Sequence, residues 1–121
     1  MFSEEDVVLK MEGIYKAFGS VRVLERVDWT LHRGEVLGLI GENGAGKSTL
    51  IKILCGIHRM DKGSIVLGGK KVDILNASHA QKLGISTIYQ EFRVMPALNA
   101  GQNIFLNREL TPQRTLVSRL K

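Results

Sequence analysis

Apolar and polar residues alternate along the first quarter of the chain. Val7, Leu9 and Met11 occupy every second position of a segment that runs to Phe18-Gly19. Residues 21–31 repeat the alternation, which is typical of strands with one buried face. We therefore predict two strands that pair antiparallel, with Arg33-Gly34 as the turn that follows them.

Two later segments are apolar on consecutive residues: VLGLIG at 36–41 and ISTIYQE at 85–91. Such runs suit strands buried on both faces, as in a parallel or mixed sheet. Between them, residues 47–57 carry apolar side chains at helical spacing and predict a helix. The order strand, glycine-rich loop, helix indicates an α/β fold.

The remaining elements are shorter. Residues 62–74 contain Gly68-Gly69 between two apolar runs and predict a β-hairpin. Residues 77–84 predict a short helix that ends at a glycine, and residues 92–101 predict a loop. The segment QNIFLNREL, residues 102–110, and the tail beyond it are predicted to be helical.

Composition narrows the class of protein. With 121 residues, 44% of them hydrophobic and 24% charged, the chain matches one folded domain or part of one. The net charge is +5, but residues 108–121 alone contribute +3, so we expect no nucleic-acid partner. A single cysteine, Cys55, cannot form an internal disulfide, and no apolar run approaches a membrane-spanning length. We expect a cytoplasmic location.

The stretch GENGAGKST, Gly41 to Thr49, fits the phosphate-loop pattern G-x-x-x-x-G-K-[ST]. A triphosphate needs many hydrogen-bond donors close together, and backbone N–H groups at a helix N-terminus supply them. Lys47 can then reach the β- and γ-phosphates, and the Ser48 hydroxyl can bind Mg²⁺. The alternative is a glycine-rich turn that only caps a helix. The predicted nucleotide-binding residues of this loop are Gly41, Asn43, Gly44, Ala45, Gly46, Lys47, Ser48 and Thr49.

Four segments together, KAFG, GENGAGKSTLIKILCGI, GSIVLGGKKV and GISTIYQE, resemble the nucleotide-binding subunit of ATP-binding cassette (ABC) transporters. The likeness extends through nearly all of residues 7–107 and is greatest to the subfamily that powers bacterial uptake of monosaccharides such as ribose, galactose or xylose. It implies an α/β fold with two parts. One is a P-loop NTPase core fragment, which consists of a mixed sheet with the phosphate loop and the helix that follows it. The other is the antiparallel β-subdomain of an ABC ATPase. Residues 1–107 would be the N-terminal part of the nucleotide-binding domain, and residues 108–121 the start of the helical subdomain or a disordered tail.

The resemblance also implies roles for single residues. Phe18 matches the aromatic residue that stacks on adenine, and Val23 the apolar residue beside it. Gln90 matches the glutamine that contacts Mg²⁺ and the attacking water, so Gln90 and Lys47 are the candidate catalytic residues, and Ser48 and Gln90 the candidate metal ligands. The alternatives are a core residue at position 18 and a surface polar residue at position 90.

The resemblance predicts partners as well: ATP, Mg²⁺, transmembrane permease subunits, a second cassette and, indirectly, a periplasmic sugar-binding protein. The loop after residue 90 would contact the membrane subunit, and Arg93, Gln102 and Asn107 depart there from the family pattern. The protein would lie on the cytoplasmic face of the inner membrane.

Several parts of an ABC ATPase are missing from the 121 residues: an LSGGQ-like signature, a later strand that ends in Asp-Glu, and the switch histidine. We therefore predict an N-terminal part of a cassette that binds Mg·ATP weakly and hydrolyses it negligibly, while the parent protein is an ATPase. The alternatives are a non-transport ABC ATPase acting on nucleic acid or the ribosome, a small P-loop kinase or GTPase, and an inert scaffold.

Overall fold

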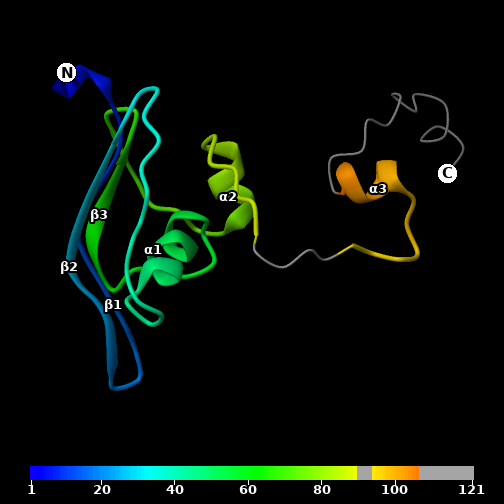
Figure 1. Ribbon diagram of the computed structural model, residues 1–121, viewed down its shortest axis with the longest axis horizontal. Helices are drawn as coiled ribbons and strands as arrows, with labels where there is room; N and C mark the ends of the chain where they lie inside the picture. The colour runs from blue at the N-terminus through cyan, green and yellow to red at the C-terminus, as the bar shows by residue number, and fades with distance from the viewer. Residues whose placement is uncertain (90–93, 107–121) are drawn as a thin grey trace, which may run out of the picture. The chain divides into compact units, whose positions relative to one another are not determined.

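A computed structural model describes residues 1–89 and 94–106 (Figure 1). The chain divides into two compact units, Met1–Thr87 and Ile88–Lys121. The first unit contains a 3₁₀ turn, η1 (Glu4–Asp6), and then β1 (Val7–Phe18), β2 (Val21–His32), α1 (Lys47–Leu54), β3 (Lys62–Leu67), β4 (Lys70–Val72) and α2 (Ala77–Lys82). In the second unit the structure describes α3 (Ala100–Ile104).

The four strands form an antiparallel sheet in the order β2-β1-β3-β4. Both predicted hairpins are confirmed. Gly68 and Gly69 make the turn between β3 and β4 with φ angles of 56° and 78°, which glycine adopts without steric strain. The sheet thus corresponds to the antiparallel β-subdomain that the sequence predicts.

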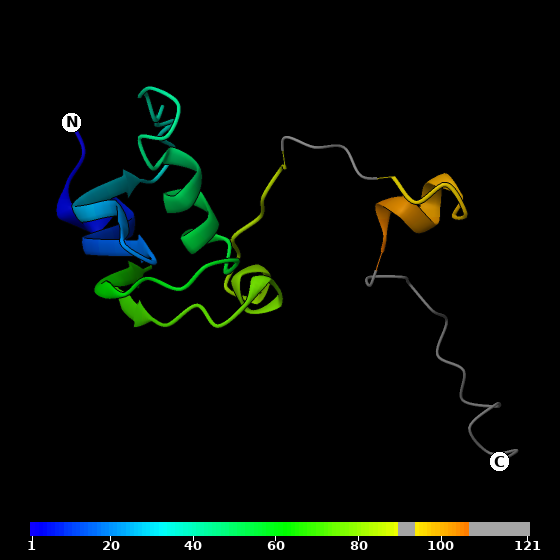
Figure 2. The same ribbon diagram turned by 90° about the horizontal axis from the view of Figure 1, so that it is seen from below.

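One face of the sheet is apolar and the other is polar, as the alternation in β1 and β2 predicts. Met11 pairs with Trp29 on one side and with Ile65 on the other, and it is fully buried. Figure 2 shows α1 against this face, where its Leu50 and Ile53 join the core. The core consists of Leu9, Met11, Ile14, Leu24, Leu50, Ile53, Ile65, Ile74 and Ala80.

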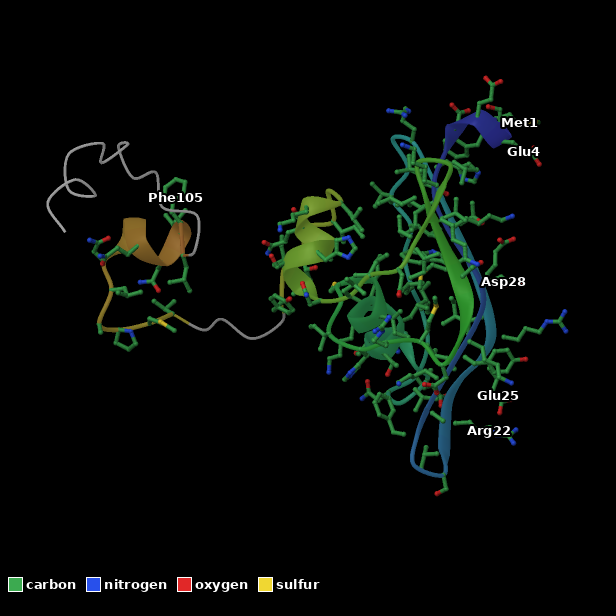
Figure 3. All side chains as sticks on the ribbon, turned by 180° about the vertical axis from the view of Figure 1, so that it is seen from behind. Met1, Glu4, Arg22, Glu25, Asp28 and Phe105 are labelled. Carbon is green, nitrogen blue, oxygen red and sulfur yellow. The ribbon has the colours of Figure 1, made fainter. Side chains whose placement is uncertain are left out.

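The opposite face of the sheet carries charged side chains. Figure 3 shows Arg22, Glu25 and Asp28 of β2 on the side away from α1. Arg22 and Glu25 form an exposed ion pair with an N–O distance of 3.2 Å. Exposed pairs of this kind contribute at most about 1 kcal/mol, so the buried face and not the charged one stabilises the sheet.

The helix after the loop is shorter than predicted, because it ends at Leu54 and not at Ile57. Gly56 is the physical reason. Its φ of 76° lies outside the helical region, and the following N–H, of Ile57, donates to the carbonyl of Lys52 at 2.8 Å. A β-carbon on Gly56 would lie 2.4 Å from the carbonyl carbon and oxygen of Asn76. The glycine therefore both ends α1 and lets the chain before α2 approach closely.

The helix predicted at residues 77–84 is confirmed as α2, whereas the one predicted from residue 102 is confirmed only in part, because α3 ends at Ile104 and residues 105–106 are not helical. Asn76 caps α2, since its side chain accepts a hydrogen bond from the N–H of His79 at 2.8 Å. Asn99 and Gln102 form a capping box at the start of α3. This cap places the first residue of α3 at Ala100, two residues earlier than the sequence predicts, and residues 107–110 of that prediction lie outside the described part of the chain.

The two predicted buried strands are wrong in this structure. Residues 36–41 and 85–89 form no strand, and Val36, Ile40 and Ile88 are 99%, 99% and 100% exposed. A strand buried on both faces needs hydrogen-bonded neighbours and two covering layers. Within residues 1–89 and 94–106 the paired strands form the antiparallel sheet alone, so the predicted mixed sheet is not found there.

Candidate functional site: a phosphate loop and an exposed aromatic ring

The loop from Gly41 to Gly46 leads directly into α1. Gly46 is the N-cap residue of this helix, with φ 94°, and Gly44 has φ 85°. The first intrahelical hydrogen bond runs from the N–H of Leu50 to the carbonyl of Gly46 at 2.9 Å. The backbone N–H groups of residues 46–49 therefore have no acceptor within the helix and are available to an anion.

Gly46 also fixes the position of the loop against the sheet. A β-carbon there would lie 2.9 Å from the backbone oxygen of Val23 and 2.7 Å from Cδ2 of Leu24. At Gly41 a β-carbon would lie 3.2 Å from that of Ala45. The loop thus has the close backbone packing that a phosphate-binding turn requires, and the residues present fit a bound phosphate group.

Lys47 carries the positive charge of the loop. Its ammonium donates hydrogen bonds to the backbone oxygens of Gly41 and Glu42, the second at 2.7 Å. Ser48 beside it is exposed and Thr49 is half-buried. The charge and the two hydroxyls therefore lie together at the N-terminal end of α1, as the sequence predicts.

Phe18 stands at the end of β1, and the residue is 42% exposed. The alternative of a buried core residue at this position is therefore wrong. Val23 follows on β2, and its backbone oxygen lies so close to Gly46 that a β-carbon on Gly46 would be 2.9 Å from it. One hairpin thus carries an accessible aromatic ring and also contacts the last residue of the phosphate loop.

The residues that surround this ring were not predicted from sequence. His58 makes a T-shaped contact with Phe18, with ring centroids 5.1 Å apart and an interplanar angle of 69°. The ammonium of Lys16 lies 5.2 Å from the centroid of Phe18. His58 lies 40 positions from Phe18 along the chain, and neither residue belongs to a motif that links them.

Asp61 joins the loop after α1 to the end of β1. Its carboxylate accepts hydrogen bonds from the backbone N–H of Ala17 at 2.8 Å and from the ammonium of Lys16 at 3.1 Å. The Ala17 N–H, and then the Lys16 ammonium, lower the pKa of Asp61 below its ordinary value of 3.8. The carboxylate is therefore charged at neutral pH, as both hydrogen bonds require.

Other predicted features lie outside the described residues. Gln90 is one of them, as are Arg93, Asn107 and the tail 108–121. Gln102 is described, as the third residue of α3. Among the described residues, no group of three His, Cys, Asp or Glu side chains could hold a metal ion, and no helix is long and apolar enough to cross a membrane.

The fold and the loop define an ATP-binding cassette, and comparisons with known proteins agree. The model of the ABC transporter family matches residues 24–120. The chain therefore belongs to the ABC transporter family.

Its similarity to individual members is high. It is 60% identical to the ribose import ATP-binding protein RbsA of Caldanaerobacter subterraneus over 84% of this chain and 21% of that protein. It is 48% identical to the galactofuranose transporter ATP-binding protein YtfR of Escherichia coli, over 84% of this chain and 20% of that protein. The chain thus spans about a fifth of the length of these relatives.

A solved structure supports the fold. The crystal structure of a nucleotide-free ATP-binding cassette from an ABC transporter superposes with a TM-score of 0.67 at 32% identity, over 70% of this chain and 34% of that one. The predicted fold class, part of an α/β ABC ATPase, is confirmed at this level.

Proposed function

We propose that this chain is the ATP-binding, N-terminal part of an ABC ATPase subunit that couples ATP hydrolysis to import of a monosaccharide. The geometry of residues 41–49 carries the proposal, because it combines unpaired helix N–H groups, glycine packing and a lysine charge. The names of the relatives, which describe ribose import and galactofuranose transport, support a sugar as the cargo.

The loop would hold the phosphates of ATP. The N–H groups of residues 46–49 donate to phosphate oxygens, and the helix dipole favours their negative charge. Lys47 exchanges its two backbone acceptors for oxygens of the β- and γ-phosphates. Asn43 and Ala45 would also lie against the phosphates, and the N–H of Ala45 donates to the carbonyl of Glu42 at 3.1 Å, which closes the turn.

Phe18 would supply the platform for the adenine ring, with Val23 packed beside the nucleotide. An exposed aromatic face is suited to a flat base, and base stacking on such a face contributes about 1–3 kcal/mol. The hairpin that carries Phe18 touches Gly46 through Val23, so base and phosphate sites belong to one unit of the fold.

Magnesium would enter with the nucleotide. Ser48 would hold it through its hydroxyl, together with Gln90, and the bound ion would neutralise charge on the phosphates. Gln90 would also orient the attacking water, since a neutral amide can accept a hydrogen bond without removing the proton. The sequence contains no counterpart of the carboxylate that acts as base in the family, so we propose that the 121 residues alone hydrolyse ATP negligibly.

The whole protein would act with other subunits. We propose permease subunits in the membrane, a second cassette and a periplasmic sugar-binding protein as partners, and a place on the cytoplasmic face of the inner membrane. Residues 1–107 would belong to the nucleotide-binding domain, and residues 108–121 would begin its helical subdomain or form a tail. Because the relatives' names describe transport, we favour this function over an ABC ATPase that acts on nucleic acid or the ribosome.

Calorimetric titration of the 121-residue chain with Mg·ATP tests the proposal. Lys47→Ala removes the charge of the loop, and Lys52→Ala is the matched control, because Lys52 is an exposed lysine of the same helix. Hydrogen bonds to charged groups contribute about 1.5–3 kcal/mol, so we expect Lys47→Ala to weaken binding about tenfold or more. Equal affinity of the two variants, or a folded wild-type chain that binds no Mg·ATP, would contradict the proposal.

Sugar import is tested in cells that produce the proposed whole transport subunit with Lys47→Ala or with Lys52→Ala. Uptake of radiolabelled ribose, galactose and xylose is measured for wild type and for Lys47→Ala. We expect uptake of one of these sugars to be lost in Lys47→Ala and kept in Lys52→Ala. Unchanged uptake of all three sugars in Lys47→Ala would refute import of these monosaccharides while leaving nucleotide binding intact.

A further inference from the structure

Three residues contact Phe18 or the chain beside it, and we call them the Phe18 brace: His58 and Asp61 of the loop that follows α1, and Lys16 of β1. His58 meets the ring at 5.1 Å in a T-shaped arrangement. Lys16 lies over the ring at 5.2 Å and is itself paired with Asp61 at 3.1 Å. The ring is therefore contacted by an aromatic group and by a cation whose position a carboxylate fixes.

Asp61 also fixes the backbone that carries Phe18. Its carboxylate accepts from the N–H of Ala17, and its own N–H donates to the carbonyl of Tyr15, each at 2.8 Å. The loop after α1 is thereby attached to the chain one and three residues before Phe18. Such local attachment orients both the backbone and the side chain of the last residue of β1.

This orientation matters because burial does not provide it. As a residue that is 42% exposed, Phe18 lacks a close-packed environment that would hold its side chain in one rotamer. An exposed ring that must become ordered on binding loses rotamer freedom, which weakens affinity, whereas a ring ordered in advance does not. Lys16 lies over the ring, so the ring already has one ordered neighbour before any ligand binds.

We propose that His58 and Asp61 are positioning residues that hold Phe18 in the orientation needed to stack a nucleobase. The proposal rests on the proposed function, in which Phe18 is the adenine platform. It adds that base recognition depends on the loop at the C-terminal end of α1, the same helix whose N-terminal end forms the phosphate site. A structural role alone would change the stability of the chain but would not distinguish ligands that carry a base from those that lack one.

The test compares two ligands of the 121-residue chain, Mg·ATP and Mg·tripolyphosphate, because the second has the phosphates without the base. His58→Ala removes the T-shaped contact and His58→Phe retains an aromatic edge. His32→Ala is the matched control, because it removes a histidine that stacks on another aromatic ring, Phe2, at 4.7 Å. Phe18→Ala measures the platform itself, and thermal melting verifies that each variant is folded.

We expect His58→Ala to weaken Mg·ATP binding about threefold, the loss that corresponds to one aromatic pair contact. Tripolyphosphate affinity stays unchanged, His58→Phe restores ATP affinity, and His32→Ala alters neither ligand. Phe18→Ala weakens Mg·ATP binding about tenfold. Asp61→Asn should change the two affinities in the same way as His58→Ala does. Asp73→Asn is the control for it, because it breaks the exposed pair with Arg59 at 2.7 Å, and it should change neither affinity.

The outcomes distinguish this proposal from the proposed function on which it rests. If Phe18→Ala leaves ATP affinity unchanged, the adenine platform itself is wrong, and the brace has no function to support. If Phe18→Ala weakens ATP binding but His58→Ala and Asp61→Asn do not, the brace alone is refuted. Equal loss of both ligands in His58→Ala would also overturn it, because the effect would then be on the phosphate site or the fold.

Discussion

Gly46→Ala probes the place where the phosphate loop touches the sheet. The substitution has two separate costs. A residue with a side chain at φ 94° is strained by about 1–2 kcal/mol, and the new β-carbon would lie 2.9 Å from the backbone oxygen of Val23 and 2.7 Å from Cδ2 of the buried Leu24. Forcing such a contact into a packed region costs about 1–3 kcal/mol more.

Gly44→Ala separates the two costs. Gly44 has a similar φ of 85°, but a β-carbon there would meet no atom within 4 Å. The control therefore carries the conformational strain without the collision. We expect Gly46→Ala to lower the free energy of unfolding by about 2 kcal/mol more than Gly44→Ala does.

Urea denaturation measures this difference, followed by the fluorescence of Trp29, the one tryptophan of the chain, which packs against the core. With a slope of about 2 kcal/mol per molar urea, the midpoints of the two variants should differ by about 1 M. Mg·ATP titration of the folded fraction should show weaker binding in Gly46→Ala. Coincident urea curves and equal affinities for the two variants would refute the packing argument.

Three further predictions concern the same unit. Gly56→Ala should destabilise the chain by more than 2 kcal/mol in urea titrations, because its β-carbon would meet the backbone of Asn76 at 2.4 Å. Gly84→Ala is the control, since it has open space around it and should cost about 1 kcal/mol. Equal costs of the two substitutions would contradict the close approach. Asn76→Ala should lower the free energy of unfolding by about 1 kcal/mol through loss of the α2 cap. An unchanged urea midpoint would show that the cap does not stabilise the fold. Because the pKa of Asp61 is lowered in the fold, its stabilising effect is present above pH 3.8 and is lost as the pH falls through the lower folded value. The stability gap between wild type and Asp61→Asn should therefore stay constant from pH 7 to about pH 4 and narrow on further acidification below pH 3.8, and a gap that does not narrow there would show that the hydrogen bonds do not depend on the charge.

Local patterns predicted the elements whose cause is local. The alternation from Val7 to Met11 marks one buried face, and that face is the core face of β1. Gly68-Gly69 determines a two-residue turn through backbone conformation alone. The phosphate loop was also predictable, since glycine, lysine and hydroxyl residues at fixed spacing act within nine positions.

Features that depend on distant residues were not predictable in this way. The apolar run at 36–41 indicates that a strand there would be buried on both faces. A strand also needs a neighbouring strand for its backbone hydrogen bonds, and the described residues do not provide one. The contacts of His58 and Asp61 with the end of β1 span about 40 positions, and no periodicity connects such segments. The end of α1 at Leu54 required knowledge of the backbone of Asn76 as well as of Gly56.

The two hydrogen bonds that Lys47 donates to the loop have a consequence for how a ligand enters. Two of the three N–H donors of the ammonium are bonded to the oxygens of Gly41 and Glu42, so an anion that takes more than one hydrogen bond from Lys47 competes with the protein's own backbone. Each further bond to the anion is then an exchange, whose free energy is the difference between two charge-assisted bonds. Under the proposed function, a dense polyanion that offers several oxygens at once would displace these backbone acceptors more readily than a single weakly charged oxygen, so Lys47 would favour ligands of high negative charge whatever their base.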